Sequence, residues 1–408
     1  MLANPNSRSR TALRGLFLLA SVIVALPARE MAWTASCLPA LSPHIALASV
    51  LALREASILA VLALPVVVLA MLIPRWFCHY ACPTGTLQEL LARIHPNAML
   101  KNRTLLPIGK ILVLLTLGGA LVGYPLLLWL DPLAIFNSFI NAWHRPLTLA
   151  ALLPGVSLPL LLLFDWLFPH VWCTRVCPLG ATQEFLAWPQ RCRKSGKRCD
   201  VLEPSGTPTM TSRFTAGRRE FLSSSAGAAL ALWVTCGKGQ TKSPLRPPGS
   251  VAEENFAGVC IRCGNCSQAC PAHIIQPDLG TYGFANLLTP CLAFTSDFCR
   301  SDCHRCTEVC PSGAIKQLSL EQKNACHIGR AIIDLDICLL ASGRECTACI
   351  RVCPYHALFI QTSKDGFATE PSVNPDKCNG CGACVPACPV RPQPAIIING
   401  SFSQRQGS

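Results

Sequence analysis

The first half of the chain is dominated by long apolar stretches, whereas apolar residues in the second half come only in short runs. Four stretches, Thr11–Ala28, Ala56–Ile73, Ile111–Leu130 and Leu147–Phe168, hold at most one charged residue each. A helix needs about 20 apolar residues to cross the hydrocarbon core of a bilayer. Tryptophans near their ends are typical of a membrane interface: Trp129, Trp143, Trp166 and Trp172. We therefore predict a four-span α-helical membrane domain over residues 1–188.

The charge distribution supports this interpretation. The chain is 51% hydrophobic and 14% charged, with a formal net charge of +13. Residues 1–254 hold 23 Lys and Arg against 11 Asp and Glu, whereas residues 255–408 hold 12 against 11. The basic residues cluster before the first apolar stretch, between the second and third, and after the fourth, which predicts that both ends of this domain face the cytoplasm of a bacterial inner membrane. No basic stripe with interleaved aromatic residues is present, so we do not expect a nucleic-acid partner.

The membrane half contains an internal repeat. The motif Cys78-x3-Cys82-Pro83-x-Gly85-x2-Gln88-Glu89 returns 95 residues later, beginning at Cys173. Each copy follows an even-numbered apolar stretch, so the repeat predicts two hairpins of the same orientation about an axis along the membrane normal. Its four cysteines are candidate ligands of one further redox or metal centre: Cys78, Cys82, Cys173 and Cys177. The alternative is four reduced thiols at helix starts, with the prolines in the first turn.

The C-terminal half, residues 250–400, repeats a cysteine pattern that ends in Cys-x3-Cys-Pro four times. The motifs begin at Cys260, Cys299, Cys338 and Cys378. Such spacing is typical of bacterial ferredoxins, in which three cysteines of a motif bind one [4Fe–4S] cluster and the fourth binds its neighbour. We predict an α+β polyferredoxin domain with four clusters and sixteen ligands: Cys260, Cys263, Cys266, Cys270, Cys299, Cys303, Cys306, Cys310, Cys338, Cys346, Cys349, Cys353, Cys378, Cys381, Cys384 and Cys388.

Two questions about these ligands stay open in the sequence. The second motif opens as Cys299-x3-Cys303, and Cys291 is a rival for its first ligand. The motifs can pair as first with second and third with fourth, or as first with fourth and second with third. Structural zinc and a disulfide scaffold are the other interpretations of the cysteines, but zinc sites do not require the Cys-Pro, and disulfide scaffolds are typical of small secreted chains.

Between the halves lies a sequence that is typical of an export signal. Residues 189–217 are basic and rich in Pro, Ser and Thr, which predicts a cytoplasmic linker. Arg218-Arg219-Glu-Phe-Leu then precedes a short apolar run to Cys236, and this order is typical of a twin-arginine (Tat) signal. We expect residues 218–236 to engage the Tat translocase and to form a fifth helix if uncleaved, with the ferredoxin domain in the periplasm.

The two halves resemble two known families. Residues 1–200 resemble the NapH-type membrane subunit, with four spans and two Cys-x3-Cys-Pro motifs. Residues 215–400 resemble the NapG/MauM-type ferredoxin in the Arg-Arg-Glu-Phe-Leu segment, in Cys263-Gly-Asn-Cys266, and in Ile328–Asp334 leading to Cys338. The resemblance implies a fusion that passes electrons from membrane quinol to a periplasmic reductase, of the nitrate reductase type, or to a cytochrome. Only Cys192 and Cys199 follow the fourth span, too few for the cytoplasmic ferredoxin segment that NapH-type proteins usually have.

A quinol dehydrogenase also needs a proton acceptor. The predicted external loop from Asp131 to Pro146 offers Asp131 and His144 among aromatic residues, and we identify these two as candidate quinol-site residues. An aromatic belt with incidental polar residues is the alternative. Two rival functions are a redox-sensing regulatory or assembly protein and a membrane ferredoxin that faces the cytoplasm.

Overall fold

The computed structural model describes residues 5–26, 34–94, 107–143, 152–188, 215–236, 243–362 and 369–400. The chain forms two compact units. The first comprises residues 1–238 with 254–263 and 311–314, and the second comprises the remaining residues. The division differs from the predicted boundary at residue 250, because the segment holding Cys260 and Cys263 belongs to the helical unit. Most of the predicted linker, residues 189–214, lies outside the described residues, as do Cys192 and Cys199.

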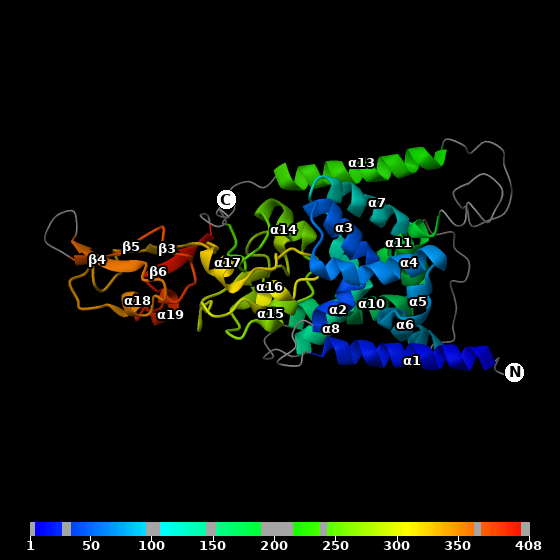
Figure 1. Ribbon diagram of the computed structural model, residues 1–408, viewed down its shortest axis with the longest axis horizontal. Coiled ribbons are helices and arrows are strands. Elements are labelled where there is room, and N and C mark those ends of the chain that lie inside the picture. The colour runs from blue at the N-terminus through cyan, green and yellow to red at the C-terminus, as the bar shows by residue number, and fades with distance from the viewer. Residues whose placement is uncertain are drawn as a thin grey trace. The chain divides into compact units, whose positions relative to one another are not determined.

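The first unit is helical, and the duplicated motif gives it two equivalent sets of elements. The first set is α1 (Pro5–Ala25), α2 (Thr34–Ala40), α3 (Pro43–Leu53), η1 (Ile58–Ala63), α4 (Leu64–Leu72), α5 (Trp76–Tyr80) and α6 (Pro83–Ile94). The second is α7 (Ile108–Leu121), η2 (Leu128–Leu130), α8 (Pro132–Trp143), η3 (Leu153–Val156), α10 (Ser157–Leu167), η4 (Trp172–Val176) and α11 (Pro178–Leu186). Two further helices follow these sets along the chain, α13 (Thr215–Cys236) and α14 (Glu253–Val259) (Figure 1).

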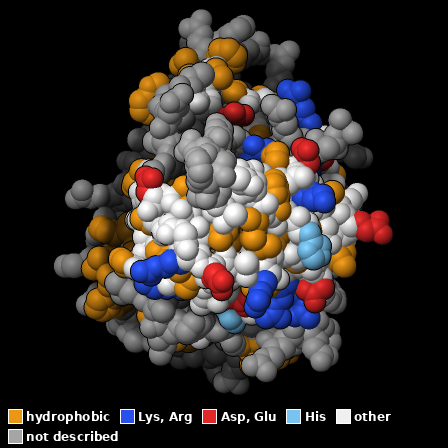
Figure 2. Space-filling view, turned by 90° about the vertical axis from the view of Figure 1, so that its left-hand side faces the viewer, with side chains coloured by type: hydrophobic (Ala, Val, Ile, Leu, Met, Phe, Trp, Pro, Cys, Tyr) orange, Lys and Arg blue, Asp and Glu red, His pale blue; other side chains and the backbone are white. Residues whose placement is uncertain are grey.

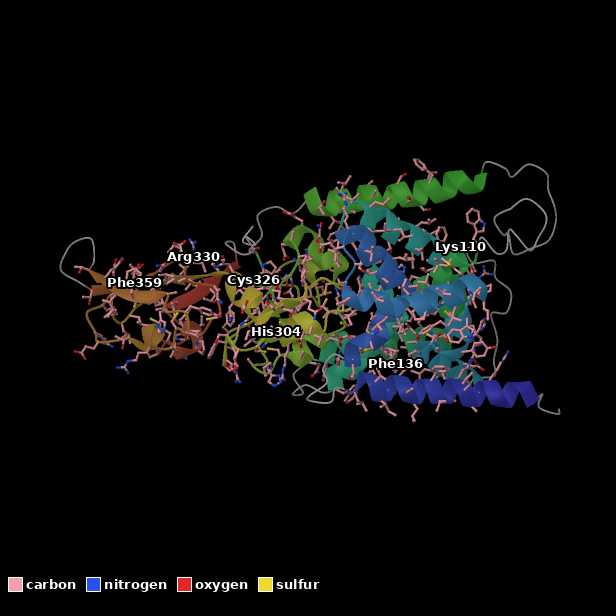
Figure 3. All side chains as sticks on the ribbon, viewed as in Figure 1. Lys110, Phe136, His304, Cys326, Arg330 and Phe359 are labelled. Carbon is pink, nitrogen blue, oxygen red and sulfur yellow. The ribbon has the colours of Figure 1, made fainter. Side chains whose placement is uncertain are left out.

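The two sets pack on each other in a crossed manner. Helix α6 packs on α1 of its own set and on α10 of the other, and α11 packs equivalently on α7 and α4. The shared core holds Phe77, Leu133, Leu158 and Leu179, together with Phe136 on α8 (Figure 3). Equivalent contacts on both sides confirm that the sequence repeat is a structural repeat.

Helices lie in all four predicted apolar stretches. Those in the second, third and fourth stretches are shorter than predicted, whereas α1 has 21 residues. Within the described ranges no single helix is both long and apolar enough to cross a bilayer, although the bent pair α2 and α3, at 88°, meets that test together. The predicted external loop after Asp131 is wrong, because residues 132–143 form helix α8. All but two of the α8 residues are buried, so its apolar residues gain more from packing than they would in a loop.

Helix α13 contains the predicted signal segment and packs along α7. A methyl group added at Gly118 of α7 would collide with the Ser224 carbonyl oxygen, and one added at Gly227 of α13 would collide with the Leu115 carbonyl oxygen. Small residues at a helix crossing let the backbones approach closely, as they do between membrane helices. This packing requires glycine at both positions.

The second unit consists of short elements around the cysteine motifs. Its elements are α15 (Asn265–Ala269), β1 (Ile275–Pro277), η5 (Phe284–Asn286), β2 (Pro290–Leu292), α16 (Arg305–Glu308), α17 (Leu320–Ala325), β3 (Arg330–Ile333), α18 (Ala348–Arg351), β4 (Leu358–Thr362), β5 (Thr369–Val373), α19 (Cys384–Ala387) and β6 (Ile396–Asn399). The strands form three antiparallel pairs, β1 with β2, β3 with β6 and β4 with β5.

The strand pairs form two nested sets. Strands β3 and β6 pair from Arg330↔Asn399 to Ile333↔Ile396, and they enclose the hairpin of β4 and β5. In the same way the bridge Ser250↔Ile315 encloses the pair β1 and β2. An outer strand pair around an inner hairpin therefore occurs twice, once around the first two motifs and once around the last two.

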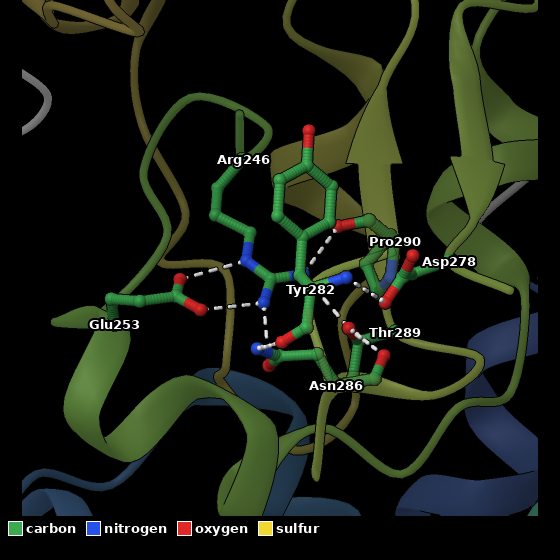
Figure 4. A network of polar contacts seen from close by, with 7 residues as sticks. All are labelled: Arg246, Glu253, Asp278, Tyr282, Asn286, Thr289 and Pro290. Atoms are coloured by element: carbon green, nitrogen blue, oxygen red, sulfur yellow. Dashed lines mark hydrogen bonds and ion pairs between the residues drawn. The ribbon is translucent and has the colours of Figure 1, made fainter. Parts of the chain in front are cut away.

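A buried arginine braces the first of these sets (Figure 4). Arg246 is 2% exposed, and every N–H of its guanidinium is used. It forms two bonds with Glu253 at 2.7 and 2.8 Å and bonds of 2.9 Å to Asn286, Thr289 and the Pro290 carbonyl. Because guanidinium has five N–H donors, this site leaves none unsatisfied.

We predict that Arg246→Met lowers the free energy of unfolding by about 3 kcal/mol, since it strands buried oxygens and the Glu253 carboxylate. The denaturant concentration at which cluster absorbance is lost would measure this. The exposed Arg344→Met is the control, with a change of about 0.5 kcal/mol or less. Equal effects of the two substitutions would contradict the bracing role.

Candidate metal centres

The cysteines of the second motif line a cavity together with one cysteine of the first. Cys299, Cys303 and Cys306 surround it with Cys270, and Ile274, Ile275 and Leu292 complete the wall. The space amounts to about 370 Å³, part of it open to solvent. Three cysteines from one motif and the last cysteine of its partner are the ligand set of a ferredoxin cluster.

The third and fourth motifs exchange their last cysteines in the same way. One cavity is lined by Cys388 and three cysteines of the third motif: Cys338, Cys346 and Cys349. The other is lined by Cys353 and three cysteines of the fourth motif: Cys378, Cys381 and Cys384. The motifs therefore pair as first with second and third with fourth, which resolves the question left open by the sequence.

Cys291 lies apart from these cavities. It is the central residue of β2, and its sulfur donates to the Gln276 carbonyl oxygen on β1 at 3.4 Å. Cys299 instead lines the cavity of its motif. The geometry therefore favours Cys299 as the first ligand of the second motif.

The three cavities form a row in the second unit. The backbone N–H of Cys299 donates to the Cys381 carbonyl oxygen at 2.9 Å, so the second-motif cavity adjoins the fourth-motif cavity. Cys384 lies close enough to Cys349 for the two thiolates to repel each other, so the fourth-motif cavity adjoins that of the third. The order in space is second, fourth, third, which is not the order along the chain.

The third-motif cavity lies at the end of this row, beside the hairpin of β4 and β5, since Pro371 of β5 lines it. Phe359 and Ile360 of β4 are 44% and 47% exposed (Figure 3). Figure 2 shows the hairpin end of the molecule, where charges of both signs lie among hydrophobic side chains.

The remaining expected ligands are Cys260, Cys263, Cys266 and Cys310. The backbone N–H of Ile315 donates to the Cys310 sulfur at 3.4 Å, and that of Ala357 donates to the Cys353 sulfur at 3.3 Å. The last cysteines of the second and third motifs thus have the same kind of partner. Within the helical unit, Asn141 of α8 donates to the Cys263 carbonyl oxygen at 2.8 Å, and the Arg262 guanidinium lies 5.1 Å from the centre of the Trp129 ring.

The chemistry of the cavities fits an iron–sulfur cluster. Burial raises the pKa of the Cys299, Cys349 and Cys381 thiols to about 11, and repulsion among neighbouring thiolates adds to this effect. Iron would stabilise the thiolates and release their protons. In the described part of the chain no three His, Cys, Asp or Glu side chains are arranged around a single metal ion. The cysteines surround cavities instead, and the cavity walls are otherwise mostly apolar.

The structure also brings together the four repeat cysteines of the helical unit. The thiolates of Cys82, Cys173 and Cys177 lie close enough to Cys78 to raise its pKa, an effect second to that of burial. Two glutamines cross between the copies. The Cys173 sulfur donates to Gln88 at 2.5 Å, and Gln183 donates to the Cys78 sulfur at 3.3 Å. Each copy therefore supplies a polar contact to the first cysteine of the other.

Charged residues join the same two copies. Arg75, directly before the first motif helix, forms an ion pair of 2.7 Å with Glu184, and its guanidinium also lies 3.5 Å from the Cys173 and Thr174 carbonyl oxygens. Glu89, which corresponds to Glu184, pairs with Arg14 on α1. Gln88, Glu89, Gln183 and Glu184 were visible in the sequence as repeat identities, but only the fold shows that Gln88, Gln183 and Glu184 contact the other copy.

The two candidate quinol-site residues have different outcomes. His144 lies outside the described residues. Asp131 is fully buried at the start of α8, where it accepts from Ser42 at 2.6 Å and from the Leu133 N–H at 2.9 Å. Burial raises the pKa of Asp131 to about 6, although these hydrogen bonds act in the opposite direction. Asp131 thus caps a helix, and its role toward quinol stays a prediction.

One buried polar residue in this unit was missed from the sequence. His44, at 1% exposed, lies 3.1 Å from the Thr182 hydroxyl through Nδ1, while its Nε2 has no hydrogen-bond partner in the structure. A lone histidine in an apolar stretch gives no signal in the sequence.

Comparison with protein families agrees with these sites. A model described as a 4Fe–4S binding domain matches residues 56–102 and again 150–196, which are the two copies of the repeat. Two models described as 4Fe–4S dicluster domains match residues 259–315 and 344–391. Each dicluster match lies within one of the two nested strand sets.

Individual relatives decide the family. The methylamine utilization ferredoxin-type protein MauM of Methylorubrum extorquens is 34% identical over 185 residues, which are 42% of this chain and 80% of MauM. Ferredoxin-type protein NapG of Escherichia coli is 34% identical over 205 residues, 45% of this chain and 85% of NapG. The chain belongs to the MauM/NapG family of ferredoxin-type proteins. Ferredoxin-type protein NapF of E. coli is 33% identical over 146 residues, 36% of this MauM/NapG-type chain and 80% of NapF. No solved structure matches the chain described here.

We predict that Cys299→Ser lowers the iron content of the anaerobically purified chain by about four irons, since it removes one ligand of one cluster. Cys291→Ser is the matched control, and we expect it to leave the iron content unchanged. Iron and sulfide analysis with electron paramagnetic resonance (EPR) of the reduced protein would measure both. The reverse result would transfer the ligand assignment to Cys291.

We predict that Cys78→Ser combined with Cys173→Ser also removes about four irons while the ferredoxin clusters keep their EPR signals. The prediction assumes that the four thiols hold one cluster, so that loss of one cysteine from each copy empties the site. Cys37→Ser, in α2 of the same unit, is the control. An unchanged iron content in the double variant would show that the four thiols hold no cluster.

Proposed function

We propose that this ferredoxin-type iron–sulfur electron-transfer protein is a quinol dehydrogenase module. The helical unit would act as a NapH-type membrane domain, and residues 243–400 would pass electrons to a periplasmic reductase or cytochrome. The observation that carries the proposal is the convergence of four repeat cysteines in a duplicated helical unit of the same chain as a ferredoxin-type unit. This joins a candidate membrane redox centre to a row of cluster sites.

The exterior of the helical unit supports a membrane location. Large apolar side chains on several of its helices point outward, among them Leu19, Ile58, Val68, Leu160 and Leu167, each more than half exposed. In water such a surface would be costly, whereas lipid tails would cover it. The basic connections predicted to face the cytoplasm agree with this proposal.

The described contacts support entry of electrons near α8. The segment with the first two ligands of the first motif packs in the helical unit, where Asn141 and Trp129 hold Cys263 and Arg262. Asp131 begins this helix and His144 follows it. Quinol oxidation releases two electrons and two protons. Each cluster, when bound, takes up and releases one electron at a time, and a protein base must accept the protons.

The export of the ferredoxin unit is part of the proposal. Arg218 and Arg219 lie at the start of α13, and the apolar part of this helix, Phe221–Thr235, is short for a span. The Tat route carries folded proteins, which would let the clusters be inserted in the reducing cytoplasm first. In this arrangement the acceptor would approach the end of the row, beside β4 and β5.

Two other functions remain as rivals with distinct outcomes. A redox-sensing regulatory or assembly protein would hold clusters that quinol does not reduce. A cytoplasm-facing membrane ferredoxin would be reduced and oxidised from the inner side only.

We predict that a reduced quinol analogue bleaches the cluster absorbance of the full chain in anaerobic right-side-out vesicles, and that a quinone-site inhibitor blocks this. A membrane-impermeant oxidant added outside should then restore the absorbance, because the ferredoxin unit is expected on that side. His144→Ala should slow reduction most above pH 6.5, where the neutral imidazole would accept the proton. Clusters that stay oxidised with quinol, but respond to a soluble reductant in inverted vesicles, would replace this proposal with the cytoplasm-facing ferredoxin.

A further inference from the structure

A lysine is buried in the segment that connects the two nested ferredoxin sets. Lys323 is the fourth residue of α17 and is 1% exposed. Ser319 caps this helix and forms a capping box with Gln322, which fixes the first turn and holds the Lys323 side chain inward. Lysine is rarely buried to this extent without a partner of opposite charge, because removing an ammonium from water is costly.

The oxygen partners of this ammonium are neutral. Its Nζ donates to the Arg300 carbonyl oxygen and lies 3.4 Å from Asn324 Oδ1. Asn324 Oδ1 also accepts from the Tyr355 hydroxyl at 2.9 Å. Neutral oxygens compensate only part of the cost of burying a charge, so a nearby negative group would stabilise the ammonium further.

A cluster ligand lies beside this arrangement. The Arg300 carbonyl oxygen that accepts from Lys323 belongs to the residue directly after Cys299. Burial raises the pKa of the Cys299 thiol to about 11, and the positive charge of Lys323 acts against this effect. Cys299 lines the second-motif cavity, and Tyr355 lines the fourth-motif cavity. The chain Lys323–Asn324–Tyr355 thus runs between two neighbouring cavities.

The rest of the connecting segment is fixed to the fourth motif. His327 Nδ1 lies 3.1 Å from the Cys378 carbonyl oxygen, and the Ile328 N–H donates to the Asn379 carbonyl oxygen at 2.8 Å. Cys326, between α17 and this contact, is labelled in Figure 3. At the other end, the Leu318 N–H donates to the Thr307 hydroxyl of the second motif at 3.4 Å. Both ends of the segment are therefore held, which keeps Lys323 near the boundary between the cavities.

We propose that Lys323 raises the reduction potential of the cluster held by Cys299, Cys303, Cys306 and Cys270, with Asn324 and Tyr355 as positioning residues. A cluster gains one negative charge when it is reduced, and a fixed positive charge beside one of its ligands stabilises that form. The lysine therefore favours the electron at the point where the row passes from one ferredoxin set to the other. This inference rests on cluster binding and is independent of quinol as the donor.

The test is a redox titration of the full chain followed by EPR, in which the second-motif signal is identified by its loss in Cys299→Ser. Lys323→Met should shift the potential of this signal downward, and Lys323→Arg, which keeps the charge, should restore most of the shift. Tyr355→Phe should give a smaller downward shift. The matched control is Lys377→Met, because Lys377 is exposed although it precedes the ligand Cys378, and water should screen its charge.

Two results would overturn the proposal. One is an unchanged second-motif potential in Lys323→Met protein of full iron content, and the other is an equal shift of that potential in Lys377→Met. If Lys323→Met does not retain its iron, a second measurement tests the proposal in protein that keeps Lys323. Lys377→Met protein is labelled with ¹⁵N-lysine, so that Lys377 contributes no signal. Pulsed EPR of the reduced second-motif cluster should then detect a ¹⁵N coupling from Lys323, and its absence would also overturn the proposal.

Discussion

The requirement that four thiolates from two separate motifs surround one apolar cavity organises the second unit. No single motif meets it, since the last cysteines of the first, third and fourth motifs line the cavity of their partner motif. The chain must therefore return on itself between paired motifs, and the inner hairpins β1–β2 and β4–β5 make these returns. The outer pair β3–β6 then closes the second set, and Ser250 with Ile315 closes the first.

The helical unit brings its cysteines together in a different way. There the cysteines come from two copies of one motif, and the copies meet because α4 packs on α11 and α10 on α6. The crossed contacts of Gln88 and Gln183 place one polar group on the first cysteine of each copy. Hydrogen bonds to sulfur ligands tune redox centres, so these contacts agree with the proposed further centre. In that proposal the duplication supplies both halves of the ligand set from one motif.

Burial has different consequences for two charged groups of the second unit. Arg246 is buried with a carboxylate and a complete set of acceptors, so its charge is compensated within the protein. Lys323 is equally buried but has neutral oxygens and a cluster ligand as neighbours. The first arrangement stabilises the fold. The second leaves a positive electrostatic potential at the proposed second-motif cluster, where it raises the reduction potential.

The sequence by itself predicted sixteen ferredoxin cysteines, of which twelve line the three cavities. It also determined the duplication and the approximate places of the four apolar helices. These are local properties, because ligand spacing and apolar runs are written within a few residues of one another. It predicted a loop after Asp131 where the fold places α8, since helix and interfacial loop share the same apolar and aromatic composition.

Only the tertiary structure decided the pairing of the motifs, their order in space, the choice of Cys299 over Cys291, and the positions of His44 and Lys323. Each of these depends on which distant segments meet, and residue spacing along the chain carries no information about that.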